Sequence, residues 1–286
     1  MALWGAQSLQ RAKVIAVANC KGGCGKTTTA VNLSAELAAR GHSVLLVDLD
    51  PQGHAGLGLG FVGDQQRIFA HDLLRGDPVD FARIVRSAST GLDLLPADRK
   101  FEPSAARSDP YGFAKALTAI ETSYDVVVID TPPAADLPLV AALTAAHDVL
   151  APTQLTPLAH DGLTHFSQVF FYVATRLNPN LGAFAIAPTQ IDLRTRVQQA
   201  VLAKLIADFG PQRLFHGIRA DVALAEAFGH GCPARDFRPD SRGAVDYARL
   251  AEDVEKAWLG EPAERLREGA AIDPCGRAFA LLRPDA

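Results

Sequence analysis

The chain has 286 residues, of which 48% are hydrophobic and 21% are charged, the balance of a globular protein with a sizeable core. Its formal net charge of −4 argues against attraction of nucleic acid to the chain as a whole, although a local basic face can still bind it. No window approaches the about 20 apolar residues that span a bilayer, and the four cysteines form no CxxC pair. We therefore expect a cytoplasmic protein with free thiols and no stable membrane insertion.

Short apolar runs alternate with segments of helical periodicity along most of the chain. The runs predicted to be buried strands are 14–18, 44–47, 92–95, 126–129, 149–151 and 184–187. The segments predicted to be helices include 28–40, 138–146, 162–177, 197–209 and 250–259. Because the strands lack polar alternation and are joined by helices, we predict a mostly parallel, twisted sheet with helices on both faces. This single α/β domain is expected over 13–259, between an extension (1–12) and an appendage (260–286).

A glycine-rich segment, KGGCGKTT at 21–28, lies between the first predicted strand and the first predicted helix. Glycines let backbone N–H groups approach phosphate oxygens, and the following helix directs its positive end at the same anion. Lys26 can reach the β- and γ-phosphates of a nucleotide, and the Thr27 hydroxyl can ligate Mg²⁺. The segment therefore predicts an ATP–Mg²⁺ site. The residues predicted to cradle the phosphates are Gly22, Gly23, Cys24, Gly25, Lys26, Thr27 and Thr28.

Carboxylates follow two of the predicted strands. Asp48 and Asp50 come after the second strand, and Asp130 ends the fourth. In a parallel sheet these strand ends meet at the edge where ligands bind. Hydrolysis of a nucleotide needs one carboxylate for the Mg²⁺ shell and another to orient or deprotonate water. We expect Asp130 to bind Mg²⁺ through water, and Asp48 to support Mg²⁺ and Thr27 from behind.

These segments resemble those of a known family. Residues 19–33, NCKGGCGKTTTAVNL, resemble the deviant Walker A box of the ParA/MinD family of P-loop ATPases, and LLVDLDPQG (45–53) and VVVIDTPP (126–133) resemble its next two motifs. The resemblance implies an ATP-dependent homodimer in which Lys21 reaches the nucleotide of the partner subunit. It also implies that Lys21, Lys26, Asp50 and Asp130 serve catalysis, with Asp50 positioning the attacking water.

The chain departs from the family pattern at two places near the phosphates. Cys24 stands where valine is common, and His54-Ala55-Gly56 stands where Asn-Ala-Thr is common. The backbone at position 24 matters more than its side chain, so we expect little effect there. The second departure concerns the details of the switch segment around Asp50, and does not concern nucleotide binding.

The resemblance continues to about residue 257. The segment 189–195, TQIDLRT, is similar to the family's loop beside the adenine base, so Gln190 and Asp192 are expected at the nucleotide. The segments 222–227 and 240–244 match its C-terminal signature, and these later motifs favour the ParA (Soj-like) branch over MinD. About a dozen residues precede the first strand, so we expect no N-terminal helix-turn-helix domain.

ParA proteins bind DNA without sequence preference when ATP has made them dimers, through basic side chains that displace counterions from phosphates. Arginines rather than lysines dominate the second half of this chain. The arginines expected to contact DNA are Arg194, Arg196, Arg219, Arg235, Arg238 and Arg242, with Arg194 and Arg219 in family-matched loops. Alternatively, they are solvated surface residues paired with nearby aspartates. The implied role is to position a chromosome, plasmid or protein assembly along the nucleoid, with hydrolysis stimulated by a ParB-like or other cargo-adaptor protein.

Two alternatives belong to other functional classes. A MinD-like membrane-associated ATPase would carry a basic amphipathic helix at its C-terminal end, whereas the predicted helix 250–259 contains Glu252, Asp253 and Glu255. A binding scaffold without enzymatic activity would be expected to lose Lys26 or Asp50, and both are present. We therefore prefer the hypothesis of a ParA-like ATPase over both alternatives.

Overall fold

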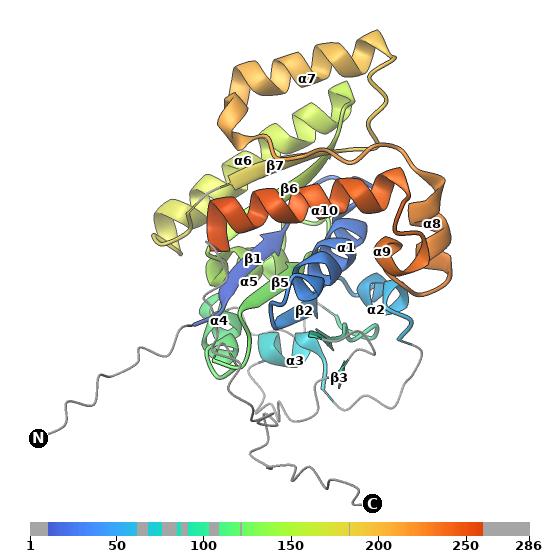
Figure 1. Cartoon of the computed structure of the whole chain (residues 1–286). Helices are drawn as coiled ribbons and strands as arrows, with labels where there is room; N and C mark the ends of the chain where they lie inside the picture. Colours follow the sequence, from blue (N-terminus) through green and yellow to red (C-terminus); the bar gives the residue numbers. More distant parts are fainter. Residues whose placement is uncertain are drawn as a thin grey trace, which may run out of the picture.

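The structure is a computed structural model that describes residues 11–61, 68–75, 85–86, 91–102, 109–120, 122–182 and 184–259. Its centre is a sheet with the strand order β3-β4-β2-β5-β1-β6-β7 (Figure 1). The strands are β1 (Lys13–Val17), β2 (Val44–Asp48), β3 (Val85–Arg86), β4 (Leu92–Leu95), β5 (Val126–Asp130), β6 (Asp148–Gln154) and β7 (Phe184–Thr189). All pairings are parallel except that of β3 with β4. The predicted fold class is confirmed.

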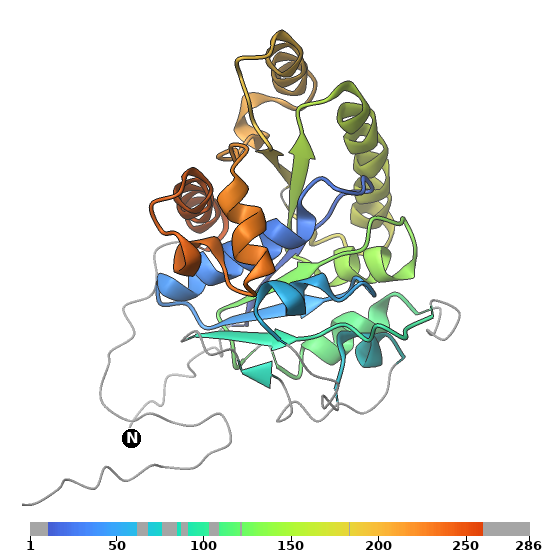
Figure 2. The same cartoon turned by 90° about the vertical axis from the view of Figure 1, so that its right-hand side faces the viewer.

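Helices cover both faces of this sheet. They are α1 (Lys26–Ala39), α2 (His54–Gly58), α3 (Ala70–Arg75), α4 (Tyr111–Leu117), α5 (Leu137–Ala145), α6 (Pro157–Arg176), α7 (Arg196–Phe209), α8 (Val222–Gly229), α9 (Ala234–Phe237) and α10 (Arg242–Val254), with a π-helical turn at Glu255–Leu259 and a 3₁₀ turn at Pro211–Arg213. Helices α1 and α10 pack on one face, and α4, α5 and α6 pack on the other (Figure 2). No helix of the described residues is long and apolar enough to cross a membrane.

The central strands form because their side chains are apolar on both faces. All five residues of β2 and all five of β5 are buried, as expected for strands sandwiched between helix layers. The parallel register places Val17 beside Asp130, and Asp130 beside Asp48. Three strands therefore end together at one edge of the sheet. The glycine-rich segment that follows β1 lies at this edge.

The structure differs from the predicted elements mainly at helix starts. Helix α6 begins at Pro157, five residues before the predicted start, because the Thr156 hydroxyl accepts a hydrogen bond from the Ala159 N–H and proline suits the first helical position. Helix α10 begins at Arg242, where Ser241 caps it in the same way. The two-residue edge strand β3 was not predicted, since so short a segment carries no period. The predicted appendage 260–286 and residues 1–10 of the extension lie outside the described residues.

Candidate nucleotide-binding site

The glycine-rich loop between β1 and α1 has the backbone of an anion cradle. Gly23 and Gly25 have φ angles of 71° and 91°, a left-handed region that favours glycine. Gly25 is the N-cap of α1, and as a glycine it has no side chain that could accept a hydrogen bond from the first turn of this helix. The N–H groups at this end of α1 are therefore available to a phosphate.

Lys26 is held at the loop by its own backbone. Its Nζ atom donates to the Lys21 carbonyl at 3.1 Å, and the side chain is buried. A buried ammonium with a single neutral acceptor is a strong attractor of an anion, because burial weakens the screening of its charge. The residue predicted to reach the β- and γ-phosphates thus lies in the cradle.

Cys24 packs inside the loop and supports its shape. Its side chain is fully buried, its Sγ donates to the Lys21 carbonyl at 3.1 Å, and its own carbonyl accepts from Thr189 Oγ1 at 2.9 Å. Burial raises the pKa of the Cys20 and Cys24 thiols, so both remain neutral thiols at pH 7. Cys24 therefore replaces the family's valine as a small buried side chain, with its backbone facing Thr189.

Two carboxylates lie beside the loop at the ends of neighbouring strands. Asp48 and Asp130 are register partners, and both are completely buried. Asp48 is satisfied by the chain itself, because it accepts from the N–H groups of Asp50 at 3.0 Å and Ala55 at 3.1 Å. Neither carboxylate oxygen of Asp130 has a hydrogen-bond partner among the described residues. Burial raises the pKa of Asp130 to about 7, and the Asp50 carboxylate adds to this effect, whereas the nearby Thr27 hydroxyl and Lys26 ammonium act in the opposite direction.

The unpartnered oxygens of Asp130 fit a Mg²⁺ site. A buried carboxylate without hydrogen bonds is costly unless a cation compensates it. Mg²⁺ uses one or two carboxylates together with substrate phosphates and waters, so it does not need an all-protein cage. The described residues contain no group of three or more His, Cys, Asp or Glu side chains that would form such a cage. Asp130 and Thr27, with Asp48 behind them, are therefore the residues that would hold Mg²⁺.

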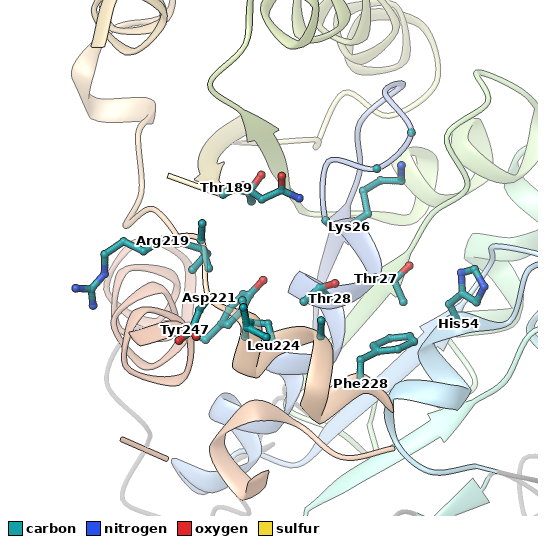
Figure 3. Close-up of a pocket in the computed structure, with 18 of the residues that line it drawn as sticks. Lys26, Thr27, Thr28, His54, Thr189, Arg219, Asp221, Leu224, Phe228 and Tyr247 are labelled. Atoms are coloured by element: carbon teal, nitrogen blue, oxygen red, sulfur yellow. The ribbon is translucent and has the colours of Figure 1, made fainter. Parts of the chain in front are cut away.

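A cavity of about 970 Å³ opens beside the loop (Figure 3). This volume lies within the range of nucleotide-sized ligand pockets. The lining residues that the sequence analysis predicted for ATP are Gly22, Gly23, Gly25, Lys26, Thr27, Thr28, Asp50 and Gln190. The opposite wall is formed by residues of the segment 218–228, which covers most of α8 and the loop before it. The structure thus brings together the predicted phosphate loop, Asp50 and Gln190 around one cavity.

Asp50 occupies the turn between β2 and α2. Its Oδ1 accepts from the Gln52 N–H at 3.0 Å, and Gly53 follows with a φ of 66°. Asp50 lines the same cavity as Lys26 and Thr27. Its carboxylate is therefore anchored at one oxygen and remains beside the phosphate end of the site.

Gln190 and Asp192, both predicted to lie beside the adenine base, have different positions relative to the cavity. Gln190 lines the cavity, with an unusual φ of 53° and a bond from Gln154 Nε2 at 3.0 Å. Asp192 is not among the lining residues, and its carboxylate accepts from the Arg194 Nε and Nη2 atoms at 2.8 and 2.6 Å. Contact of Asp192 with a nucleotide remains a prediction.

Lys21 lies at the outer end of the loop, outside the cavity lining. A Cβ placed on Gly162 of α6 would lie 3.4 Å from the Lys21 Cβ, so the absent side chain there leaves room for the lysine stem. Among the described residues the Lys21 ammonium has no ion pair. Leu158, in the first turn of α6, is 69% exposed. Lys21, which forms no ion pair with the described residues, and the exposed Leu158 thus lie beside the loop.

The six predicted DNA-contacting arginines differ in their surroundings. Four of them are in ion pairs, and Arg219 points away from the cavity toward α10 (Figure 3). The ion pairs are Arg194–Asp192, Arg219–Asp246, Arg235–Glu36 and Arg238–Glu226. Arg196 and Arg242 are exposed and form no such salt bridge within the described chain, and Arg242 also lines the cavity. Contact of any of the six with DNA remains a prediction.

Sequence reasoning missed several residues of the cavity. Leu224 and Phe228 of α8 and Tyr247 of α10 line it, and the Tyr247 hydroxyl lies 3.2 Å from Thr29 Oγ1. Apolar residues four apart on a helix indicate packing in general and do not reveal what they pack against. His54 also lines the cavity; its only signal was its departure from the family pattern.

The chain is similar to several proteins of known role or structure. Residues 12–183 match a family model described as an AAA domain. The chain is 40% identical over 246 residues to the chromosome-partitioning ATPase Soj of Thermus thermophilus, covering 85% of this chain and 96% of that protein. It is 36% identical over 249 residues to the chromosome partitioning protein ParA of Caulobacter vibrioides, covering 85% and 93%. The structure of the septum site-determining protein MinD of Pyrococcus horikoshii with Mg-ADP matches with a TM-score of 0.72 and 26% identity, covering 86% of this chain and 96% of that one. Its ligands agree with the predicted nucleotide and Mg²⁺.

Proposed function

The chain belongs to the ParA/MinD family of P-loop ATPases, and from this premise we propose that it is a Mg²⁺-dependent ATPase that dimerises on ATP, binds DNA without sequence preference and positions or segregates a cargo. Chromosome partitioning is the role named for two of its relatives. The observation that carries the proposal is the carboxylate of Asp130, which is buried beside a preformed phosphate loop and has no hydrogen-bond partner in the part of the chain that the structure describes.

In the proposed reaction, each residue at the phosphate end has a separate task. The Lys26 ammonium leaves the Lys21 carbonyl and binds the β- and γ-phosphates, while the N–H groups of the loop hold their oxygens. Mg²⁺, when bound, neutralises charge that develops on the phosphates. Asp50 orients a water molecule for attack on the γ-phosphorus and receives its proton, so that ATP and water become ADP and phosphate.

Dimerisation is proposed to occur at the face that carries Lys21. Two nucleotides that face each other carry high negative charge, and a cation from each subunit neutralises the nucleotide of the other. Lys21 meets this need, because its ammonium is free of ion pairs with the described residues. Leu158 offers an exposed apolar contact on the neighbouring helix.

DNA binding is proposed for the dimer, through arginines on the surface around α7 to α10. Arg196 is the best supported, because it is exposed, has no salt bridge within the described chain and does not line the cavity. A partner protein at the cargo then stimulates hydrolysis, after which the dimer and its DNA contacts are lost. A membrane-associated role is less well supported, because the end of α10 and the turn after it carry the acidic side chains Glu252, Asp253 and Glu255.

The proposal is tested by sedimentation and by binding to a random-sequence DNA duplex, each with Mg-ATP, with Mg-ADP and without nucleotide. We expect a dimer that binds DNA in ATP alone. Lys21→Ala should stay monomeric and leave DNA unbound while still binding ATP, and Lys115→Ala, an exposed lysine on α4, is the control. A wild-type chain that stays monomeric at millimolar ATP, or binds DNA equally in every nucleotide state, would contradict the proposal.

A further inference from the structure

Phe228 lies at the meeting point of three elements around the cavity. It belongs to α8 and lines the cavity, and its ring is edge-on to His54, with centroids 6.4 Å apart at 80° (Figure 3). A Cβ placed on Gly58 of α2 would lie 2.9 Å from Phe228 Cε2 and 3.2 Å from Val31 Cγ2 of α1. Gly58 thus packs against both the Phe228 ring and α1, the helix that follows the phosphate loop.

A second contact fixes the ends of α2 and α8 to each other. A Cβ on Gly60 would lie 2.7 Å from the Gly231 carbonyl oxygen, and one on Gly231 would lie 2.6 Å from the Gly60 Cα. Both glycines have positive φ, 70° and 67°. The two backbones therefore touch without side chains between them, and this contact has no rotamers through which it could adjust.

Helix α2 is joined in turn to the acidic residues at the phosphates. The Ala55 N–H donates to Asp48 Oδ2 at 3.1 Å, and the Asp50 N–H donates to Asp48 Oδ1 at 3.0 Å. One carboxylate therefore holds both the first turn of α2 and the turn that carries Asp50. A displacement of α2 relative to α1 would move Asp50 relative to Lys26 and Thr27.

We propose that Phe228 is a positioning residue for ATP hydrolysis, which sets the distance of the Asp48–Gly58 segment from the phosphate loop through its contact with Gly58. The inference rests on the proposed ATPase function. The loop itself belongs to β1 and α1, so its contacts with the phosphates do not depend on the placement of α2. The rate of hydrolysis does depend on it, because an attacking water must be placed to within about an ångström.

The inference is tested with Gly58→Ala, Phe228→Leu and the double variant. Gly58 has a φ that alanine can adopt, so the new methyl group acts only through its contacts with the Phe228 ring and with Val31 Cγ2, and we expect it to displace α2 outward. Leucine at 228 removes the closest atom that the methyl group meets, Phe228 Cε2, and leaves the contact of 3.2 Å with Val31 Cγ2. Gly229→Ala is the matched control, since a Cβ at this glycine of α8 meets nothing within 4 Å.

For each variant, single-turnover hydrolysis with enzyme in excess, the Kd for ATP and the Tm are measured. Gly58→Ala should slow hydrolysis by roughly 10- to 100-fold with an unchanged ATP affinity, and the double variant should regain most of the wild-type rate. Gly229→Ala should match the wild type. Wild-type hydrolysis by Gly58→Ala, a parallel loss of ATP affinity, or a double variant no faster than Gly58→Ala would overturn the inference while the proposed ATPase stands. Absence of hydrolysis in the wild type would instead remove the proposed function, and this inference with it.

Discussion

Asp48 and Asp130 are register partners at the ends of two adjacent parallel strands, and both are completely buried, yet their carboxylates differ in hydrogen bonding. Asp48 accepts two backbone N–H groups, whereas both oxygens of Asp130 are unpartnered among the described residues. One carboxylate therefore holds the turn that carries Asp50. The other is left for a cation.

The Asp130→Asn variant should distinguish the effect of this carboxylate on folding stability from its role in binding Mg²⁺. Without Mg²⁺, removing a buried unpartnered charge should leave the free energy of unfolding unchanged or raise it by about 1–3 kcal/mol. The variant should lose most of the stabilisation that Mg-ATP gives the wild type, because the cation has lost its carboxylate. Thermal unfolding with and without Mg-ATP checks both expectations. A full Mg-ATP stabilisation in the variant would show that the metal is held elsewhere.

Asp50→Ala should bind ATP, stay dimeric and remain on DNA, but hydrolyse ATP about 100-fold more slowly or worse, the usual effect of losing a general base. Phosphate release in a single turnover measures the rate, and equilibrium binding measures the affinity. Asp161→Ala, which changes an 82% exposed carboxylate on α6, is the control. If the Asp50 variant hydrolyses ATP at the normal rate, the role given to Asp50 is wrong.

Arg219 and Arg196 should behave differently when each is changed to alanine. Arg219 donates twice to Asp246, which is 1% exposed, so its loss leaves a buried carboxylate with fewer partners and should lower the midpoint of urea unfolding. Arg196→Ala should alter stability by less than about 0.5 kcal/mol. It should lower the slope of log K for DNA against log salt by about 1. Urea unfolding and a salt series of DNA binding distinguish the two. An unchanged salt slope for Arg196→Ala would remove it from the DNA surface.

His71 should make stability depend on pH. It is completely buried, stacks on Phe101 with ring centroids 4.1 Å apart, and accepts from the Asp98 N–H at 3.0 Å. Burial lowers its pKa from 6.5 to about 4. Between these two pKa values His71 is protonated in the unfolded chain and neutral in the folded chain. The free energy of unfolding therefore falls as pH decreases.

The expected loss from His71 between pH 7 and pH 5 is about 2 kcal/mol. Urea unfolding of the wild type and of His71→Asn at the two pH values measures it, since the asparagine oxygen can still accept a hydrogen bond and does not titrate. The variant should lose about that much less on acidification than the wild type. His165→Asn, on the exposed face of α6, is the control. Equal losses in the wild type and His71→Asn would mean that His71 is protonated in the folded protein.

The sequence was most informative where neighbouring residues form the site. Gly25, Lys26 and Thr27 are consecutive, and their roles follow from a short motif between a strand and a helix. Asp50 and Asp130 follow from strand ends, because parallel strands must end at a common edge. This local logic predicted the sheet, the phosphate loop and the acidic strand ends.

Contacts between distant segments could not be predicted in the same way. The Tyr247 hydroxyl meets Thr29 across 218 positions, and Phe228 reaches Gly58 from a helix whose apolar spacing only indicates burial. The partner of Arg219 was also unexpected, because the buried Asp246 lies on a different element. Such pairings depend on how helices pack on the finished sheet.

The most direct measurement is the release of phosphate from Mg-ATP by the purified wild-type chain and by Lys26→Ala. If the loop after β1 binds the triphosphate, the wild type releases phosphate in a Mg²⁺-dependent manner, and the variant neither binds nor hydrolyses ATP. A Lys26→Ala chain that binds Mg-ATP as tightly as the wild type would contradict the account.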